Sequence, residues 1–239
     1  MRPKEEHSMN HNKVLTVSQS AAWLVALGAA FSALPAAAQT AGSVMVRAGA
    51  TQIKPNVDSG DLTPPSLPGT KASIRSDTQF AGGLTYMVTS NISIDLPLAL
   101  PFTHEIDGDG AINGVGKIGE SKVLPITLLG QYRFLAPDSM LRPYVGAGVT
   151  YAKFYKAQST AALSALTGGT PANPTTLKIK SKFAATVELG ASVAIDKRWF
   201  VDASVKRTFL KTRATLSTGQ TLDMKLDPNS YCLALGYTF

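Results

Sequence analysis

Long hydrophobic runs and cysteine are almost missing from this sequence of 239 residues. After residue 38, no stretch offers the roughly twenty consecutive apolar residues that a transmembrane helix requires. The single cysteine, Cys232, has no second cysteine in the chain with which to form a disulfide. Clusters of cysteine and histidine side chains are also missing, so neither a metal site nor a cofactor is expected.

The N-terminal residues have the three-part pattern of an export signal. A basic start precedes an apolar stretch over residues 21–31, and residues 36–38 are three alanines. A buried helix in a soluble domain is the alternative, but the order of charged, apolar and small residues favours a signal. We therefore predict a cleaved signal peptide over residues 1–38 and a single domain over residues 39–239.

Apolar side chains recur at every second position in eight segments after residue 38. This period indicates β-strands with one apolar face, and about ten residues is the length that a tilted strand needs to cross a bilayer. The last segment ends in Phe239, which resembles the terminal assembly signal of bacterial outer-membrane barrels. The segments cover residues 44–51, 80–88, 92–100, 124–134, 145–151, 183–195, 199–205 and 230–239.

The connections between these segments alternate in length. Short ones span residues 89–91, 136–141 and 196–198, and long ones lie near residues 54–76, 103–121, 155–177 and 211–226. A soluble sandwich or lipocalin-like barrel is not expected to sort its connections in this way. The predicted fold class is all-β: an eight-stranded antiparallel transmembrane β-barrel with short periplasmic turns and long extracellular loops.

Aromatic residues fall at strand ends, where the two interfaces of a membrane are expected. One group lies beside the short turns and the C-terminus: Tyr86, Tyr132, Phe134, Trp199, Tyr237 and Phe239. A second group lies toward the long connections: Phe102, Tyr151 and Phe154. Two aromatic girdles are therefore predicted.

Charged residues collect in the phase of the strands that would face the barrel interior. Three are basic and three acidic: Arg47, Asp95, Arg133, Glu188, Asp202 and Lys206. An eight-stranded barrel leaves an interior that side chains can fill, and buried charges need partners there. We predict that these six residues form a polar plug; the alternative is an ion path.

The same inward phase also contains apolar and strand-weakening residues. Four apolar positions form a candidate pocket: Met45, Ile53, Met87 and Leu129. Pro97 and Pro125 lie inside the third and fourth segments, where proline removes a hydrogen bond of the ladder. These two prolines mark a candidate wall that opens sideways to the bilayer, or alternatively simple bulges.

Seven motifs of the chain, in order, resemble the outer-membrane protein W (OmpW) family of Gram-negative bacteria. They are Val46-Arg47-Ala48-Gly49-Ala50-Thr51, Gly83-Leu84-Thr85-Tyr86-Met87, Pro101-Phe102-Thr103-His104, Leu124-Pro125-Ile126-Thr127, Gln131-Tyr132-Arg133-Phe134, Arg142-Pro143-Tyr144-Val145-Gly146-Ala147-Gly148-Val149-Thr150-Tyr151 and Gly236-Tyr237-Thr238-Phe239. The family often has Pro-Pro-Thr where this chain has Pro125-Ile126-Thr127. The long connection after residue 155 is unusually rich in Ala, Thr and Gly, and residues 161–166 are expected to form a short helical turn.

The resemblance implies a barrel in the outer membrane with a narrow hydrophobic pocket or channel for small apolar molecules. The alternative is a structural or docking protein whose loops bind external partners without transport. An enzyme is not expected, because His104 is the only histidine after residue 38 and no serine can be placed beside it from the sequence.

The net charge of +7 and its distribution bear on the partners of this barrel. The basic residues are scattered without an aromatic-basic run, so nucleic acid is not expected. A modest positive excess suits a surface that faces phosphate groups. The expected partners are outer-membrane lipid, lipopolysaccharide and a small hydrophobic solute, and the barrel is expected to act as a monomer.

Overall fold

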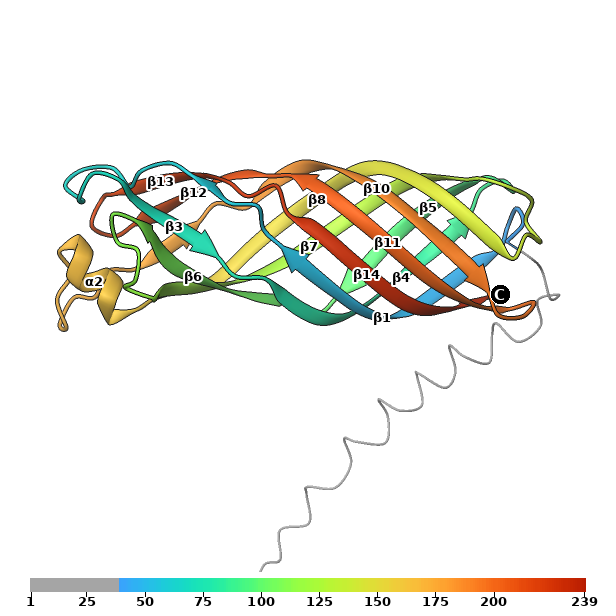
Figure 1. Ribbon diagram of the computed structural model, residues 1–239, viewed down its shortest axis with the longest axis horizontal. Coiled ribbons are helices and arrows are strands. Elements are labelled where there is room, and N and C mark those ends of the chain that lie inside the picture. The colour runs from blue at the N-terminus through green and yellow to red at the C-terminus, as the bar shows by residue number, and fades with distance from the viewer. Residues whose placement is uncertain (1–38) are drawn as a thin grey trace, which may run out of the picture. The chain divides into compact units, whose positions relative to one another are not determined.

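A computed structural model describes residues 39–239 of the chain (Figure 1). The predicted signal peptide, residues 1–38, lies outside the described residues. Within residues 39–239, no helix is both long enough and apolar enough to span a membrane.

Eight antiparallel strands close into a barrel. Its strands follow one another around the wall in the order β7, β5, β4, β1, β14, β11, β10 and β8, and pairing of β7 with β8 closes the ring. Each of the eight segments predicted from the sequence forms one strand, so the predicted fold is confirmed. The strands are β1 (Val44–Lys54), β4 (Asp77–Met87), β5 (Ile92–Ala99), β7 (Lys117–Arg133), β8 (Leu141–Ser159), β10 (Lys182–Ala194), β11 (Trp199–Phe209) and β14 (Asn229–Thr238).

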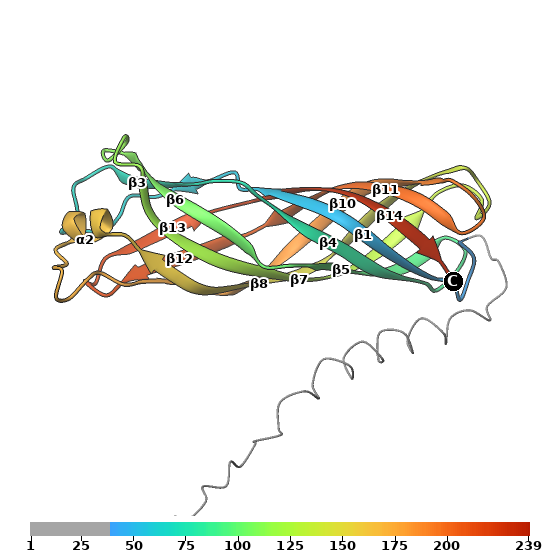
Figure 2. The same ribbon diagram turned by 90° about the horizontal axis from the view of Figure 1, so that it is seen from below.

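The four long connections are more ordered than predicted. They contain β2 (Asp58–Ser59), β3 (Thr70–Ile74), β6 (Phe102–Gly110), β9 (Leu177–Ile179), β12 (Lys211–Leu216), β13 (Thr221–Lys225) and the helix α2 (Ala161–Thr167). The helix is the short turn expected from the sequence. Strands β2, β13, β12 and β9 form a second sheet. Strand β6 pairs with β7, and β3 pairs with β6, so these two strands add to the wall. Figures 1 and 2 show these elements at the end of the barrel opposite the short turns.

The outer face of the barrel carries a broad band of exposed apolar side chains. Phe183 is 74% exposed, and several leucines around the barrel, such as Leu128 and Leu233, are also more than half exposed. Such a surface is unfavourable in water and suits contact with lipid. Aromatic pairs mark its two edges: Trp199 with Tyr237 near the turns, and Tyr151 with Phe183 toward the other end.

Two aromatic residues expected in a girdle lie elsewhere. Phe154 packs against the buried apolar side chains in the interior of the barrel. Phe102 is fully buried inside the barrel, so its predicted position at the membrane interface was wrong. The reason is that Phe102 does not continue β5 but starts β6, whose inward phase includes residues 102, 104 and 106. The alternation was read correctly, but the break between the two strands was not.

Glycine residues in the inward phase make room for large side chains on the neighbouring strand. Gly190 is the cross-strand partner of Tyr144, and a Cβ atom on Gly190 would lie 2.4 Å from the tyrosine ring. Gly236 is paired in the same way with Phe200, whose ring would lie 2.1 Å from an added Cβ atom. The interior is thus filled by placing a large side chain opposite a glycine, which has no side chain of its own.

We expect Gly190→Ala to destabilise the barrel by about 1–3 kcal/mol, because the Tyr144 ring must leave its place or strain the wall. Gly130→Ala is the matched control, since its added Cβ atom would meet only one backbone oxygen, at 3.9 Å. The measurement is the urea midpoint of unfolding in detergent micelles. Equal midpoints for the two variants would contradict this packing argument.

Candidate functional site

The end of the barrel near the short turns is sealed by a small apolar cluster. Met45, Met87 and Phe200 are buried against one another there. Met45 and Met87 were predicted to line an apolar pocket, but they do not reach the cavities described below. Leu129, also predicted for the pocket, is buried at the level of Asp95, its cross-strand partner. Of the four candidates, only Ile53 lines one of these two cavities.

Arg47 links three strands through ion pairs in the interior of the barrel, next to this cluster. Its guanidinium donates to Asp95 Oδ1 at 2.6 Å and to Asp202 Oδ1 at 2.8 Å. All three side chains are buried, and Thr85 also donates to Asp95 Oδ1. Strands β1, β5 and β11 are therefore joined through the interior of the barrel by one cation and two carboxylates.

The other predicted charges lie in the same layer but differ in their partners. Lys206 forms an ion pair with Glu188 at 3.1 Å, across neighbouring strands. Arg133 has no carboxylate within ion-pair distance among residues 39–239. Its partners are neutral oxygens of residues such as Ser192 and Gln131, and its guanidinium lies 4.5 Å from the centre of the Tyr144 ring.

Sequence reasoning missed several members of this layer. Tyr144 donates to Asp202 Oδ1 at 2.9 Å, and Arg142 is buried with its guanidinium on the backbone oxygens of Gln39 and Ser90. The sequence held a signal for both, because residues 142 and 144 share the inward phase of their strand. Both residues fall between the predicted turn, residues 136–141, and the predicted fifth segment, which starts at residue 145, so neither was assigned to the strand.

A belt of four threonine hydroxyls lies next to the charged layer. The chain of hydrogen bonds runs from Thr127 to Thr150 at 2.8 Å, to Thr186 at 2.6 Å and to Thr208 at 3.0 Å. It crosses β7, β8, β10 and β11, and all four residues line the cavity that follows. Because the hydroxyls satisfy one another, the belt is a polar surface with few free donors.

Beyond the threonine belt, the barrel encloses an apolar cavity of about 110 Å³. Arg47 and Lys206 border it on the side of the charged layer, and Phe102 lies along its wall. This volume is somewhat below the roughly 150 Å³ of an apolar cavity that stays dry and binds benzene. Its other apolar lining residues include Ile53, Ile74, Val123, Ala152, Leu210 and Leu226.

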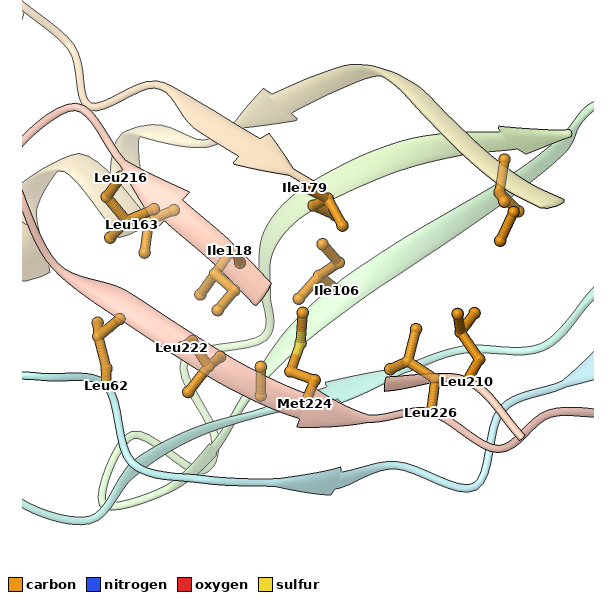
Figure 3. Close-up of a cluster of buried hydrophobic side chains, with 14 of the residues drawn as sticks. Leu62, Ile106, Ile118, Leu163, Ile179, Leu210, Leu216, Leu222, Met224 and Leu226 are labelled. Carbon is orange, nitrogen blue, oxygen red and sulfur yellow. The ribbon is translucent and has the colours of Figure 1, made fainter. Parts of the chain in front are cut away.

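A second apolar cavity, of about 90 Å³, lies among the strands beyond the membrane band. Ile106 and Ile179 line both cavities, so the two are adjacent. Figure 3 shows isoleucine, leucine and methionine side chains from β6, β7, β9, β12, β13 and α2 pointing toward one another around this space. Ser66 also lines it, and its hydroxyl has no hydrogen-bond partner within residues 39–239.

The wall beside the first cavity has an interruption, which we call the wall gap. Strands β5 and β7 pair only between residues 92–95 and 129–132. Residues 96–99 of β5 and 124–128 of β7 have no ladder partner toward each other, although each segment pairs with its other neighbour. Pro97 and Pro125 lie one on each side of this gap, and both line the cavity.

His104 lies in the cavity wall and packs 6.2 Å from the Phe102 ring. Its Nδ1 atom is 2.8 Å from the backbone oxygen of Arg75, and burial lowers the pKa of the imidazole. Ser121 is its cross-strand partner, which the sequence had not shown. The Ser121 hydroxyl donates to the backbone oxygen of Lys122 and not to His104. A serine–histidine hydrogen bond of the kind that activates a nucleophile is therefore not formed by this pair.

Comparison with known proteins is consistent across sequence and structure. A family model described as the OmpW family matches residues 40–239. Outer membrane protein W of Vibrio cholerae is 34% identical over 219 residues, which are 90% of this chain and 97% of that protein. The relatives are thus outer-membrane proteins, which agrees with a barrel in that membrane.

Solved structures give the same result. The crystal structure of OprG from Pseudomonas aeruginosa aligns with a TM-score of 0.75 at 29% identity, covering 84% of this chain and 97% of that one. The solid-state NMR structure of the outer membrane protein AlkL in DMPC lipid bilayers aligns with a TM-score of 0.63 at 26% identity, covering 84% and 91%. The outer-membrane location predicted from the sequence is confirmed.

We expect Arg47→Met to destabilise the barrel by about 3–5 kcal/mol, because Asp95 and Asp202 then remain buried without their cation. The triple variant Arg47→Met, Asp95→Asn, Asp202→Asn is expected to recover most of this loss. Urea unfolding followed by the fluorescence of Trp199, the only tryptophan after residue 38, measures it. A single variant as stable as the parent would show that the three charges do not depend on one another.

Proposed function

The chain belongs to the OmpW family, and from this premise we propose that it carries small apolar molecules across the outer membrane. In this proposal, the molecule enters the apolar cavities from outside and leaves sideways, through the wall gap, into the bilayer. The observation that carries the proposal is the position of the gap, which lies beside an apolar cavity and between two prolines.

The apolar lining favours such a cargo on simple energetic grounds. Burial of apolar surface contributes roughly 25 cal/mol per Å², so a small hydrocarbon gains free energy on leaving water for either cavity. Ile106 and Ile179 line both compartments, so a molecule in one is already next to the other. Phe102 and Phe154 provide aromatic surface along the first cavity.

The charged layer closes the direct route through the barrel. Arg47 is held by two carboxylates, and Lys206 is held by Glu188, so these charges are engaged with each other. An apolar molecule that moved further would have to break these pairs, and nothing apolar would replace them. This supports a polar plug rather than an ion path as the role of the six inward charges.

The wall gap supplies the remaining route. An unpaired backbone donor in the hydrocarbon core costs several kcal/mol, which is why barrels close completely. Pro97 and Pro125 carry no N–H group, so each removes one donor from this part of the wall. A gap beside these residues is therefore less costly than a gap elsewhere, and it connects the cavity with lipid.

A docking role without transport is the second candidate. The strands and helix beyond the membrane band offer a surface for external partners, but the two apolar cavities have no part in such a role. The reported relatives are outer-membrane proteins, which is consistent with a protein that is not an enzyme. We propose that the present chain is likewise not an enzyme, because within residues 39–239 no nucleophile forms a hydrogen bond with His104.

We expect Ala152→Phe to reduce binding and uptake of an apolar dye at least about tenfold, because the added ring fills the first cavity. Ala152 is buried in the cavity wall. Ala147→Phe is the matched control, since Ala147 lies on the same strand with its side chain outward. Cells that produce each variant are assayed with N-phenylnaphthylamine. Undiminished uptake in Ala152→Phe would favour the docking role.

The sideways route predicts a different response to Ala99→Trp. Ala99 lies at the unpaired edge of β5 and is half-buried, unlike the buried Ala152, so a tryptophan there covers the gap instead of filling the cavity. Dye uptake by cells is expected to fall about tenfold, whereas dye binding to the barrel in micelles stays within about threefold. Leu100→Trp, on the outward phase next to it, is the control. Unchanged uptake in Ala99→Trp would rule out this exit.

A further inference from the structure

Positive side chains gather on one sector of the barrel, directly beyond the apolar band. We call this set the basic sector, and it occupies β8, β9, β10, β12 and the residues between them. Its members are exposed: Lys153, Lys156, Lys178, Lys180, Lys182, Lys211 and Arg213. Within residues 39–239, Arg213 has a carboxylate partner in Asp223, and the six lysines have none within ion-pair distance.

The part of the rim formed by β6 and β7 is different. There Arg75 bonds Glu105 and Asp107, and Lys117 bonds Glu105 and Glu120. These contacts lower the pKa of Glu105 and raise the pKa of Lys117. Positive charge is therefore neutralised locally on one side and left uncompensated on the other, which produces a positive potential over the basic sector.

Four members of the basic sector line a groove. Beyond the pairing of Lys182 with Ala152, β8 no longer pairs with β10, and a groove opens between β8 and the residues around β9. Lys156, Lys178, Lys180 and Arg213 line it, together with Phe154 and Tyr155 of β8. The backbone of Lys156 has a φ of 49°, which is uncommon for a residue other than glycine and turns the strand at this point.

The groove lies at the height of lipid headgroups. On β10, Phe183 is the last member of the apolar band and Lys182 follows directly toward the rim. On the neighbouring wall, Phe209 is followed by Lys211 and Arg213. Aromatic side chains mark the membrane–water interface, so these cations stand where the phosphate groups of the outer leaflet are found.

We propose that the basic sector binds the phosphate groups of lipopolysaccharide in the leaflet around the barrel. Ammonium and guanidinium groups bind phosphate oxygens through charge-assisted hydrogen bonds, and several unpaired cations in one groove suit a multiply phosphorylated lipid. The groove faces sideways, toward lipid, on a part of the wall distinct from β5. The groove lies apart from the wall gap, although Phe154 and Ile179 line both the groove and the first cavity.

The test compares Lys178→Gln/Lys180→Gln with Lys54→Gln/Lys197→Gln, which removes the same charge from exposed lysines outside the sector. Refolded barrels in detergent micelles are titrated with fluorescent bisphosphorylated lipid A and with the same lipid stripped of both phosphates. Loss of two lysines is expected to weaken binding of the phosphorylated lipid about thirtyfold, and each single variant about fivefold. The control pair measures the effect of losing two positive charges outside the basic sector, and the stripped lipid measures binding that does not depend on phosphate.

Two outcomes would overturn the proposal. One is equal binding of the phosphorylated and stripped lipids by the parent barrel, and the other is an equal loss in the two double variants. Tripolyphosphate in solution separates the possible sources of phosphate. If it bound as tightly as the phosphorylated lipid, the groove would be a site for soluble anions and not for lipopolysaccharide. Ala152→Phe should leave lipid binding unchanged, so this test stands apart from transport.

Discussion

In a bilayer, every backbone donor and acceptor needs a partner within the protein, and this constraint governs the whole barrel. Eight strands meet it by pairing on both sides and closing through β7 and β8. At the height of the apolar band, the part of the chain that the structure describes leaves one stretch of neighbouring strands unpaired, between β5 and β7. Pro97 and Pro125 flank that stretch. Because proline has no backbone N–H group, fewer backbone donors are left without a partner where the wall is interrupted.

Closure creates a second demand, because eight strands enclose a space that must be filled. The chain fills it unevenly along the axis. Near the turns, apolar and charged side chains pack against glycines such as Gly190 and Gly236, and Arg47 links three strands. Further along, the same inward phase carries small and apolar residues, and two cavities remain. In the proposed route, the blocked end leaves the gap in the wall as the exit for a molecule in the cavity.

The strand pattern could be read from the sequence because period two reports directly which face a side chain occupies. Depth along the axis was harder, since Met45 and Ile53 share a phase but lie at different levels. The strands beyond the membrane band were also missed. Residues 212, 214 and 216 of β12 are buried in alternation with exposed neighbours, as regularly as residues in the barrel wall. Their richness in polar and turn residues pointed to loops. The loss of pairing at the wall gap depends on how strands that are distant in the sequence align with each other. No local sequence pattern contains that information.

The short strand β9 shows how closely the two proposed sites are connected. Ile179 points inward and lines both cavities, whereas Lys178 and Lys180 on either side point outward into the groove. A shift of one residue in a strand exchanges its two faces, so the pairing of β9 with β12 places the isoleucine and both lysines at once. The apolar interior and the basic sector therefore depend on the same register, and neither can be moved without the other.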